Sequence, residues 1–327
     1  MRADAQRWFA TRTHRAADWP YPRVAALKEA AALKGSATVS VVLPALNEEP
    51  TVGAIVAGVR SLGALVDEVV VVDSGCTDRT AEVAAAAGAR VVHRDDVLPE
   101  LGPSRPGKGE VLWKALQVTS GDLVVYLDAD LTGFRPSFVT GLLGPLLADP
   151  EVLLVKGFYD RPLGGEPGSG GRVTELLARP LLNLYFPELA GVVQPLAGEY
   201  AARRSLLETL PFAPGYGVEA GLLVDTVTRH GLGALAQTDL GERRHAHQDT
   251  AALGRMAAAI LHTIARRTGD PGPATLTQFA RNGGAVTPAD YPVPADERPP
   301  IASLAQYQLT MSLRENRYQA IDRKIVL

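Results

Sequence analysis

Short apolar runs rich in valine alternate, over the first half of the chain, with longer segments in which apolar residues recur at helical spacing. The apolar runs predict strands at 39–44, 69–73, 91–92 and 123–127. The segments between them predict helices at about 50–62, 77–87 and 108–119. Because these strands are continuously apolar, they are typical of a parallel sheet that is buried on both faces. Residues 38–131 therefore predict a doubly wound α/β unit with helices on both faces.

The order of elements is less regular after residue 131. The pattern predicts a strand at 152–158 and helices at 136–148, 173–184, 218–230 and 250–267. A glycine-rich stretch at 164–171 is typical of a loop. Residues from about 268 onward are rich in proline and glycine and show little periodicity before 314–324. We interpret this part as a tail that wraps around the protein.

Composition excludes several classes of protein. A chain of 327 residues with a single cysteine, Cys76, has no internal disulfide framework. The 33 Lys and Arg against 36 Asp and Glu give a net charge of −3, which offers no basic excess for nucleic acid. The chain has no apolar run long enough to span a membrane and no secretory start, so we expect a cytoplasmic protein.

Two carboxylates directly follow the strand at 123–127. Asp128 and Asp130 are two residues apart, so their side chains point to the same face of an extended chain. Ligands of open α/β sheets bind beyond the carboxyl ends of the strands. Two carboxylates at this place can bind a hard divalent cation and a ribose hydroxyl. The alternative is a solvated strand end, at which aspartate is common.

Polar residues also follow two other predicted strands. Asn47 and Glu48 lie after the first strand, where they could either contact a nucleobase or cap a helix. Ser74 and Gly75 follow the second strand and allow a ligand to approach closely. Cys76 lies in the same loop without a partner cysteine, and we interpret it as a small loop residue. The three strand ends together indicate one binding site.

Lys108 stands between two glycines at the start of a predicted helix. An ammonium group and helix N–H groups that point the same way suit a phosphate. The spacing from Gly102 to Gly107 and Lys108 also approaches a P-loop, but such a loop needs Ser or Thr where this chain has Gly109.

Three later segments carry chemistry that the pattern alone leaves open. His245 and His247 share a face if their segment is extended, and His245 could then be a metal ligand; the alternative is a basic, solvated turn at 243–247. Arg172 lies in a glycine-led helix start that suits an anion. Tyr216 and Glu219 open another helix. Ordinary helix starts are the alternative for both.

These motifs, in this order, resemble those of the actinobacterial glucosyl-3-phosphoglycerate synthases, a family of retaining GT-A glycosyltransferases. The resemblance extends over about 38–267. The strings that carry it are VVLPALNEE at 41–49, VDEVVVVDSGCTD at 66–78, RPGKGE at 105–110, YLDAD at 126–130, GGRVTELLARPLL at 170–182, QPLAGEY at 194–200 and PFAPGYGVE at 211–219. Mannosyl-transferring relatives share most of these strings.

The resemblance implies a GT-A fold and four segments. The segments are an N-terminal extension at 1–36, a nucleotide-sugar-binding α/β subdomain at 37–160, an acceptor-binding subdomain at 161–267 and a C-terminal tail at 268–327. It also implies the transfer of glucose from UDP-glucose to the 2-hydroxyl of D-3-phosphoglycerate, with Mg²⁺ or Mn²⁺ as the cofactor. A homodimer is expected as well.

The resemblance further implies a role for individual residues. The donor would contact Pro44, Ala45, Leu46, Asn47, Glu48, Ser74, Gly75, Lys108, Asp128 and Ala129. The acceptor would contact Gly171, Arg172, Thr174, Tyr216 and His247. The cation would be bound by Asp130 and His245, and the residues nearest to the reaction would be Asp130, Glu219 and the Leu196 carbonyl.

Two positions depart from the family's pattern. Ala129 stands where the family commonly has Ser, and His247 stands where relatives have Asn as an acceptor contact. The alternatives are therefore a mannosyl-3-phosphoglycerate synthase or a related GT-A enzyme with another acceptor. In other classes, the alternatives are a P-loop NTPase, a nucleotidyltransferase and a non-catalytic nucleotide-sugar-binding module.

Overall fold

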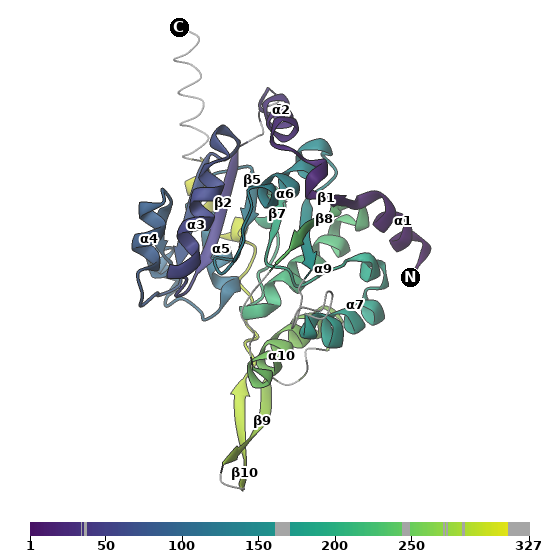
Figure 1. Cartoon of the computed structure of the whole chain (residues 1–327). Helices are drawn as coiled ribbons and strands as arrows, with labels where there is room; N and C mark the ends of the chain where they lie inside the picture. The colour runs from purple at the N-terminus through teal and green to yellow at the C-terminus, as the bar shows by residue number, and fades with distance from the viewer. Residues whose placement is uncertain are drawn as a thin grey trace.

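One large mixed sheet and a separate hairpin organise the protein (Figure 1). The computed structural model describes residues 1–33, 35, 38–160, 171–243, 249–270, 272, 274–282 and 285–312. The strands of the large sheet are β1 (Thr13–Arg15), β2 (Val39–Ala45), β3 (Glu68–Asp73), β4 (Arg90–His93), β5 (Leu123–Tyr126), β6 (Leu154–Asp160), β7 (Tyr200–Arg203) and β8 (Leu235–Glu242). The hairpin is formed by β9 (Thr275–Asn282) and β10 (Ala285–Pro292).

The strand order of the large sheet is β1-β8-β6-β7-β5-β2-β3-β4. All neighbouring strands are parallel except β7, which runs antiparallel to both β5 and β6. The registers of β2 with β3 and of β2 with β5 bring the carboxyl ends of these three strands to one edge, with Ala45 opposite Asp73 and Val42 opposite Tyr126. The predicted mainly parallel sheet is therefore confirmed.

Besides a helical segment at 305–312, ten α-helices surround the sheet in the described part of the chain. They are α1 (Ala3–Arg12), α2 (Tyr21–Ala32), α3 (Glu49–Arg60), α4 (Thr80–Ala86), α5 (Lys108–Val118), α6 (Ser137–Ala148), α7 (Arg179–Tyr185), α8 (Arg204–Leu207), α9 (Val218–His230) and α10 (Thr250–Arg267). A π-helical turn, Thr174–Ala178, precedes α7. None of the described helices is long and apolar enough to cross a membrane.

The helix predicted from residue 77 begins at Thr80 instead. The Asp78 carboxylate accepts a hydrogen bond from the Thr80 N–H at 3.0 Å. This turn satisfies a backbone donor that would otherwise be unpaired at the helix start and keeps the preceding residues outside the helix.

Alternate side chains of the central strands pack into two apolar layers, one on each face of the sheet. Val42 and Val70 belong to the layer covered by α5 and α9, whereas Val41 and Val71 belong to the layer covered by α3 and α6. Both sets are fully buried. Burial on both faces explains why these strands read as continuous apolar runs rather than as alternating ones.

The N-terminal segment is part of the sheet. β1 pairs in parallel with β8, with His14 opposite Thr238, and the indole N–H of Trp8 donates to the Leu235 carbonyl at 2.8 Å. A three-residue strand is too short to show a period in the sequence. The predicted division into four segments remains a prediction, but the sheet itself contains strands from the first three.

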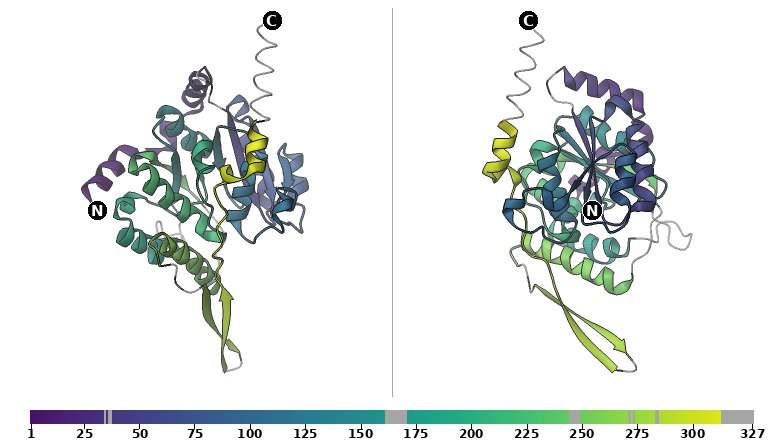
Figure 2. Two further views of the ribbon diagram at one scale, coloured as in Figure 1. Left: turned by 180° about the vertical axis from the view of Figure 1, so that it is seen from behind. Right: turned by 90° about the vertical axis from the view of Figure 1, so that its left-hand side faces the viewer.

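The described part of the tail returns along the back of the molecule after the hairpin, which projects beyond α10 (Figures 1 and 2). The Trp113 indole donates to the Pro299 carbonyl at 2.8 Å. Arg298 forms a buried two-bond ion pair with Glu110, at 2.6 and 2.7 Å. The residues after the hairpin thus pack against the protein, whereas the hairpin itself projects from it, so the interpretation of a wrapping tail is wrong for 275–292. The periodic stretch at 314–324 lies outside the described residues.

Candidate active site

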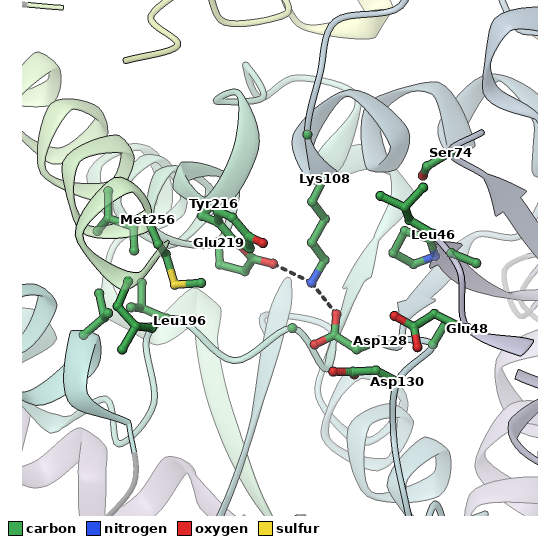
Figure 3. A pocket seen from close by; sticks show the side chains of 18 of the residues that line it. Leu46, Glu48, Ser74, Lys108, Asp128, Asp130, Leu196, Tyr216, Glu219 and Met256 are labelled. Carbon is green, nitrogen blue, oxygen red and sulfur yellow. Dashed lines mark hydrogen bonds and ion pairs between the residues drawn. The ribbon is translucent and has the colours of Figure 1, made fainter. Parts of the chain in front are cut away.

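A cavity of about 470 Å³ opens at the carboxyl edge formed by β2, β3 and β5 (Figure 3). It collects most of the residues that the sequence singles out. These are Pro44, Ala45, Leu46, Glu48, Ser74, Lys108, Asp128, Ala129, Asp130, Gly171, Arg172, Thr174, Leu196, Tyr216 and Glu219. The expected convergence of the strand ends is present, while the individual roles of these residues remain predictions.

Two residues expected at the donor site do not line this cavity. The Asn47 side chain accepts a hydrogen bond from the Thr77 N–H at 2.8 Å, and its backbone is left-handed with a φ of 59°. Gly75 has a φ of 98° and donates its N–H to the Asp73 carboxylate at 2.8 Å. Both residues therefore shape the loops at the rim. His245 and His247 lie outside the described residues.

Lys108 lies between two carboxylates. Its ammonium donates to Asp128 and forms an ion pair with Glu219 at 2.8 Å (Figure 3). Burial opposes the charge, but the two carboxylates outweigh it and raise the pKa of Lys108 above its usual value. The ammonium is therefore fixed in its charged form at the centre of the site.

The glycines that flank Lys108 are there for packing. A Cβ on Gly107 would lie 2.6 Å from the Cα of Gly215, and a Cβ on Gly109 would lie 2.0 Å from the Ala213 carbonyl oxygen. The first turn of α5 thus crosses directly against the backbone of the loop that carries Tyr216. This close crossing, rather than a P-loop, explains the Gly-Lys-Gly pattern.

Three carboxylates face each other across the strand ends. Partial burial, together with the negative charges of Asp130 and Asp128, raises the pKa of Glu48 to about 7. Asp130 remains accessible, with 45% of its side chain exposed. Carboxylate oxygens are the donors that Mg²⁺ and Mn²⁺ prefer, and this acidic surplus fits a divalent cation. The described residues contain no complete group of three metal-ligating side chains, and His245 is not among them.

Arg243 lines the cavity, although the sequence interpretation did not single it out as a site residue. The alternative of a basic, solvated turn at 243–247 is wrong for Arg243, because only 6% of its side chain is exposed. Its guanidinium forms ion pairs with Asp130 at 2.6 Å, Asp128 at 3.3 Å and Glu199 at 3.2 Å. β8 is distant in sequence from β5, so no local pattern could have shown that they place Arg243 beside the two aspartates.

The remaining wall was also missed. Arg94, directly after β4, lines the cavity. Leu253, Met256 and Ile260 line it from α10 and lie on one face of that helix. The helical spacing of these three residues was visible in the sequence, but their position opposite the carboxylates was not, because it depends on where α10 packs.

Gly198 leaves room for Asp128. A Cβ at this position would lie 2.3 Å from a carboxylate oxygen of Asp128. Any side chain there would therefore displace the carboxylate that holds Lys108, which makes Gly198 a requirement of the site geometry.

The pH dependence of stability tests whether repulsion among these carboxylates raises the pKa of Glu48. A carboxyl group whose pKa is raised by folding lowers the free energy of unfolding once it ionises. This loss of stability is absent near pH 4.5 and complete above about pH 7. In metal-free buffer, Glu48→Gln is therefore expected to raise the melting temperature by about 2 °C at pH 8 and to leave it unchanged at pH 4.5. Thermal unfolding followed by circular dichroism measures both values, and an equal shift at the two pH values would contradict the electrostatic origin.

The family described as Glycosyl transferase family 2 matches residues 40–209, which include the strand ends, Lys108 and Leu196, and the chain belongs to this family. The glucosyl-3-phosphoglycerate synthase of Mycolicibacterium smegmatis is 53% identical over 280 residues, which cover 84% of this chain and 92% of that protein. Within the glycosyltransferases, the chain is accordingly a member of the glucosyl-3-phosphoglycerate synthases.

Solved structures of the Mycobacterium tuberculosis glucosyl-3-phosphoglycerate synthase are similar over most of the chain. The complex with Mn²⁺, UDP and phosphoglyceric acid is 49% identical to this chain and has a TM-score of 0.79. The matched region includes 86% of this chain and 94% of that one. The complex with Mn²⁺, UDP-glucose and phosphoglyceric acid is 50% identical and has a TM-score of 0.77. The matched region includes 84% of this chain and 93% of that one. The GT-A fold is thereby confirmed.

Proposed function

We propose that this chain transfers glucose from UDP-glucose to the 2-hydroxyl of D-3-phosphoglycerate, with retention at the anomeric carbon, and releases UDP. The observation that carries the proposal is the arrangement of one cavity. An acidic strand edge and Lys108 lie together, and Arg172 lines the same space. An enzyme that transfers a sugar from a nucleoside diphosphate to a phosphorylated acid needs carboxylates that bind a cation and positively charged groups that bind its anionic substrates. Relatives that bear the name of this activity support it.

The donor is proposed to lie across the ends of β2, β3 and β5. Backbone and side-chain groups at Pro44–Glu48 and Ser74 would hold the uridine, and Asp128 would contact the ribose. Lys108 would contact the diphosphate, since its ammonium is fixed in the charged form. Asp130 and His245 would hold a divalent cation, which would supply Lewis-acid stabilisation of the departing diphosphate.

The transfer is proposed to occur on one face of the sugar. The bond from the anomeric carbon to the UDP oxygen breaks, a bond to the acceptor 2-oxygen forms, and the hydroxyl proton leaves with UDP. Glu219 lines the cavity, but it is buried and forms an ion pair with Lys108 at 2.8 Å, so it is not assigned as a covalent nucleophile. Retention is therefore assigned to attack from the face that UDP vacates, with the Leu196 carbonyl stabilising the positive charge on the sugar.

The acceptor is proposed to bind at the start of the helical segment that leads into α7. Gly171 has a φ of 78°, which turns the chain into the helix, and Thr174 is buried in its first turn. The helix N–H groups and the Arg172 guanidinium point to the same anion-binding role. Tyr216, with 47% of its surface exposed, would lie beside the sugar and the acceptor.

Replacing Arg172 tests the acceptor site. We expect Arg172→Ala to raise KM for 3-phosphoglycerate at least about 10-fold and to change KM for UDP-glucose less than about 2-fold, because a charge-assisted contact to a phosphate is lost only on the acceptor side. Initial rates with one substrate varied at a time give both constants. Equal changes in the two constants would remove Arg172 from the acceptor site.

A matrix of donors and acceptors tests the proposed function. UDP-, GDP- and ADP-linked glucose and mannose are each combined with 3-phosphoglycerate, glycerate or glycerol 3-phosphate in the presence of Mg²⁺ or Mn²⁺, and nucleotide release is measured. The proposal predicts that UDP-glucose with 3-phosphoglycerate gives the highest kcat/KM. Preference for a mannosyl donor or for another acceptor would replace the proposal with the corresponding alternative.

We further propose a homodimer and a cytoplasmic location. The hairpin of β9 and β10 projects from the body and exposes 70% of Phe279 and 52% of Val286 (Figure 1). A lone two-stranded hairpin is marginally stable in water, so we assign a second copy of the chain as the partner that covers it. Light scattering after size-exclusion chromatography tests the dimer. The location follows from the substrates, which are charged metabolites.

A further inference from the structure

Lys156 is a buried cation that the proposed reaction does not use. It lies on β6, only 3% of its surface is exposed, and its ammonium donates to the Ala197 carbonyl at 2.5 Å. The ammonium also lies 4.8 Å from the centre of the Tyr200 ring. Among the described residues, no carboxylate oxygen lies within 4.0 Å of the Lys156 ammonium; the nearby carboxylates form their ion pairs with Lys108 and Arg243. Among the described residues, the Ala197 carbonyl is the one direct hydrogen-bond partner of this charge.

Keeping an ammonium in this place is costly. Burial lowers the pKa of Lys156 to about 8, although the negative charges of Glu219, Glu199 and Asp128 favour the charged form. A methionine of similar length would fill the same volume without the desolvation cost. A side chain that costs stability but makes a specific contact at the edge of an active site points to a functional reason for its presence.

Lys156 contacts the loop at 194–199, which forms one wall of the cavity through Leu196 and Gly198. Neighbouring residues of β6 hold the same loop. The Gly157 N–H donates to the Glu199 carbonyl at 2.8 Å, and the Tyr159 N–H donates to the Gln194 side chain at 3.2 Å. Lys156 supplies the contact at the middle of the loop, at the residue between Leu196 and Gly198.

We propose that Lys156 is a positioning residue for glucosyl transfer: its ammonium holds the 194–199 loop so that the Leu196 carbonyl faces the transferring sugar and Gly198 stays against the Asp128 carboxylate. The inference rests on the proposed function. It differs from a contact with substrate, because Lys156 does not line the cavity and acts through Ala197. The ammonium also adds positive charge behind the acidic cluster of Glu219 and Asp128.

The central variant is Lys156→Met. We expect kcat to fall at least about 30-fold, with KM for both substrates within about 3-fold of the wild type, because the loop is displaced while the binding groups remain. We expect the melting temperature to stay the same or to rise, because a costly buried charge has been removed. Lys156→Gln, which keeps a hydrogen-bond donor without the charge, is measured in the same way and serves if the methionine variant does not fold.

Two further readouts separate positioning from a merely structural role. Hydrogen–deuterium exchange of the 194–199 backbone is expected to accelerate in Lys156→Met. The wild-type kcat is expected to fall as pH rises through about 8, because the neutral amine holds the carbonyl more weakly, and the variant is expected to lack this limb. The charged groups that face Lys156 are Glu219, Lys108, Glu199 and Asp128. Of these, Lys108 stays charged throughout the range.

Arg204 provides a matched control. It is also a buried cation that donates to backbone carbonyls, those of Gly121 and Leu116, but it follows the end of β7 that lies away from the cavity. Arg204→Met is expected to lower the melting temperature while the folded enzyme keeps its kcat and the exchange of the 194–199 loop. This variant therefore shows the effect of losing a buried cation that does not contact the 194–199 loop.

The outcomes are distinct. A Lys156→Met variant with kcat within about 3-fold of the wild type and unchanged loop exchange would overturn the proposal. A variant that loses melting temperature as Arg204→Met does, without faster loop exchange, would assign Lys156 a structural role only and would overturn it as well. A wild-type protein that forms no glucosylated product would refute the proposed function, whereas the exchange measurement would still decide whether Lys156 holds the loop.

Discussion

Asp130→Ala is expected to lose metal-dependent glucosyl transfer by about 10³-fold or more while the protein stays folded. Asp130 is the accessible carboxylate of the strand-end pair, and its loss would leave the cation without its main oxygen ligand. The departing diphosphate then lacks the charge that stabilises it. UDP release with Mg²⁺ or Mn²⁺ titrated up to millimolar concentrations measures the effect.

The structure also predicts what happens to the fold of this variant. Arg243 loses one of its three carboxylate partners but keeps Asp128 and Glu199, so the melting temperature is expected to change by only a few degrees. Asp18→Ala, which removes an exposed carboxylate that does not line the cavity, is the matched control and is expected to keep full activity. Full activity of Asp130→Ala at saturating metal would defeat the metal assignment.

Lys108→Met is expected to reduce both activity and stability. Its ammonium is the fixed positive charge at the site, and removing one preorganised group that stabilises a leaving group costs about 10²–10³-fold in kcat. Asp128 and the buried Glu219 would lose their shared cation, and breaking such a partly buried ion pair costs about 3–5 kcal/mol. The loss of stability is expected to be greater at pH 8 than at pH 5, because uncompensated carboxylates destabilise the fold when they are ionised.

Steady-state kinetics and thermal unfolding at both pH values measure these two effects. Lys28→Met, which removes a lysine that is paired with Asp67 and does not line the cavity, controls for the loss of an ion pair elsewhere and is expected to keep kcat. If Lys108→Met kept kcat within a few-fold, the diphosphate contact would have to come from another cation. Arg243 would then be the first to examine.

The convergence of the residues after the strands could be predicted, because parallel strands place their carboxyl ends at the same edge of a sheet. Each of the runs before Glu48, Ser74 and Asp128 is continuously apolar, and such strands all carry their carboxyl ends to one side. The residues that follow them therefore converge without any knowledge of side-chain packing. The resemblance to a known family then supplied the order of the motifs and the acceptor side.

The rest of the site depends on long-range packing that no local pattern records. Arg243 reaches the aspartates because β8 enters the sheet beside β6, and its segment alone is typical of an exposed turn. Lys156 reads as an interruption of an apolar strand, whereas the structure buries it under a loop some forty residues further along. The three-residue β1 has no period to detect, although it completes the edge of the sheet.

The two glycines that flank Lys108 show a related limit of sequence-based prediction. Gly107 and Gly109 suggested a phosphate loop because glycine next to lysine is typical of one, but both glycines are required by the crossing of two backbones. Glycine marks a close approach without identifying the group that approaches. The lysine between them is nevertheless placed at the site, which is why the sequence located the residue correctly while leaving its surroundings open.

The central claim is that the carboxyl edge of the sheet, joined by His245, holds a divalent cation on the diphosphate of the donor. A crystal structure of this chain with Mn²⁺ and UDP, with the metal located by its anomalous scattering, tests it most directly. The account predicts one strong peak about 2.0–2.3 Å from an oxygen of Asp130, a nitrogen of His245 and oxygens of the diphosphate. A bound UDP with the metal elsewhere, or with His245 far from Asp130, would contradict it.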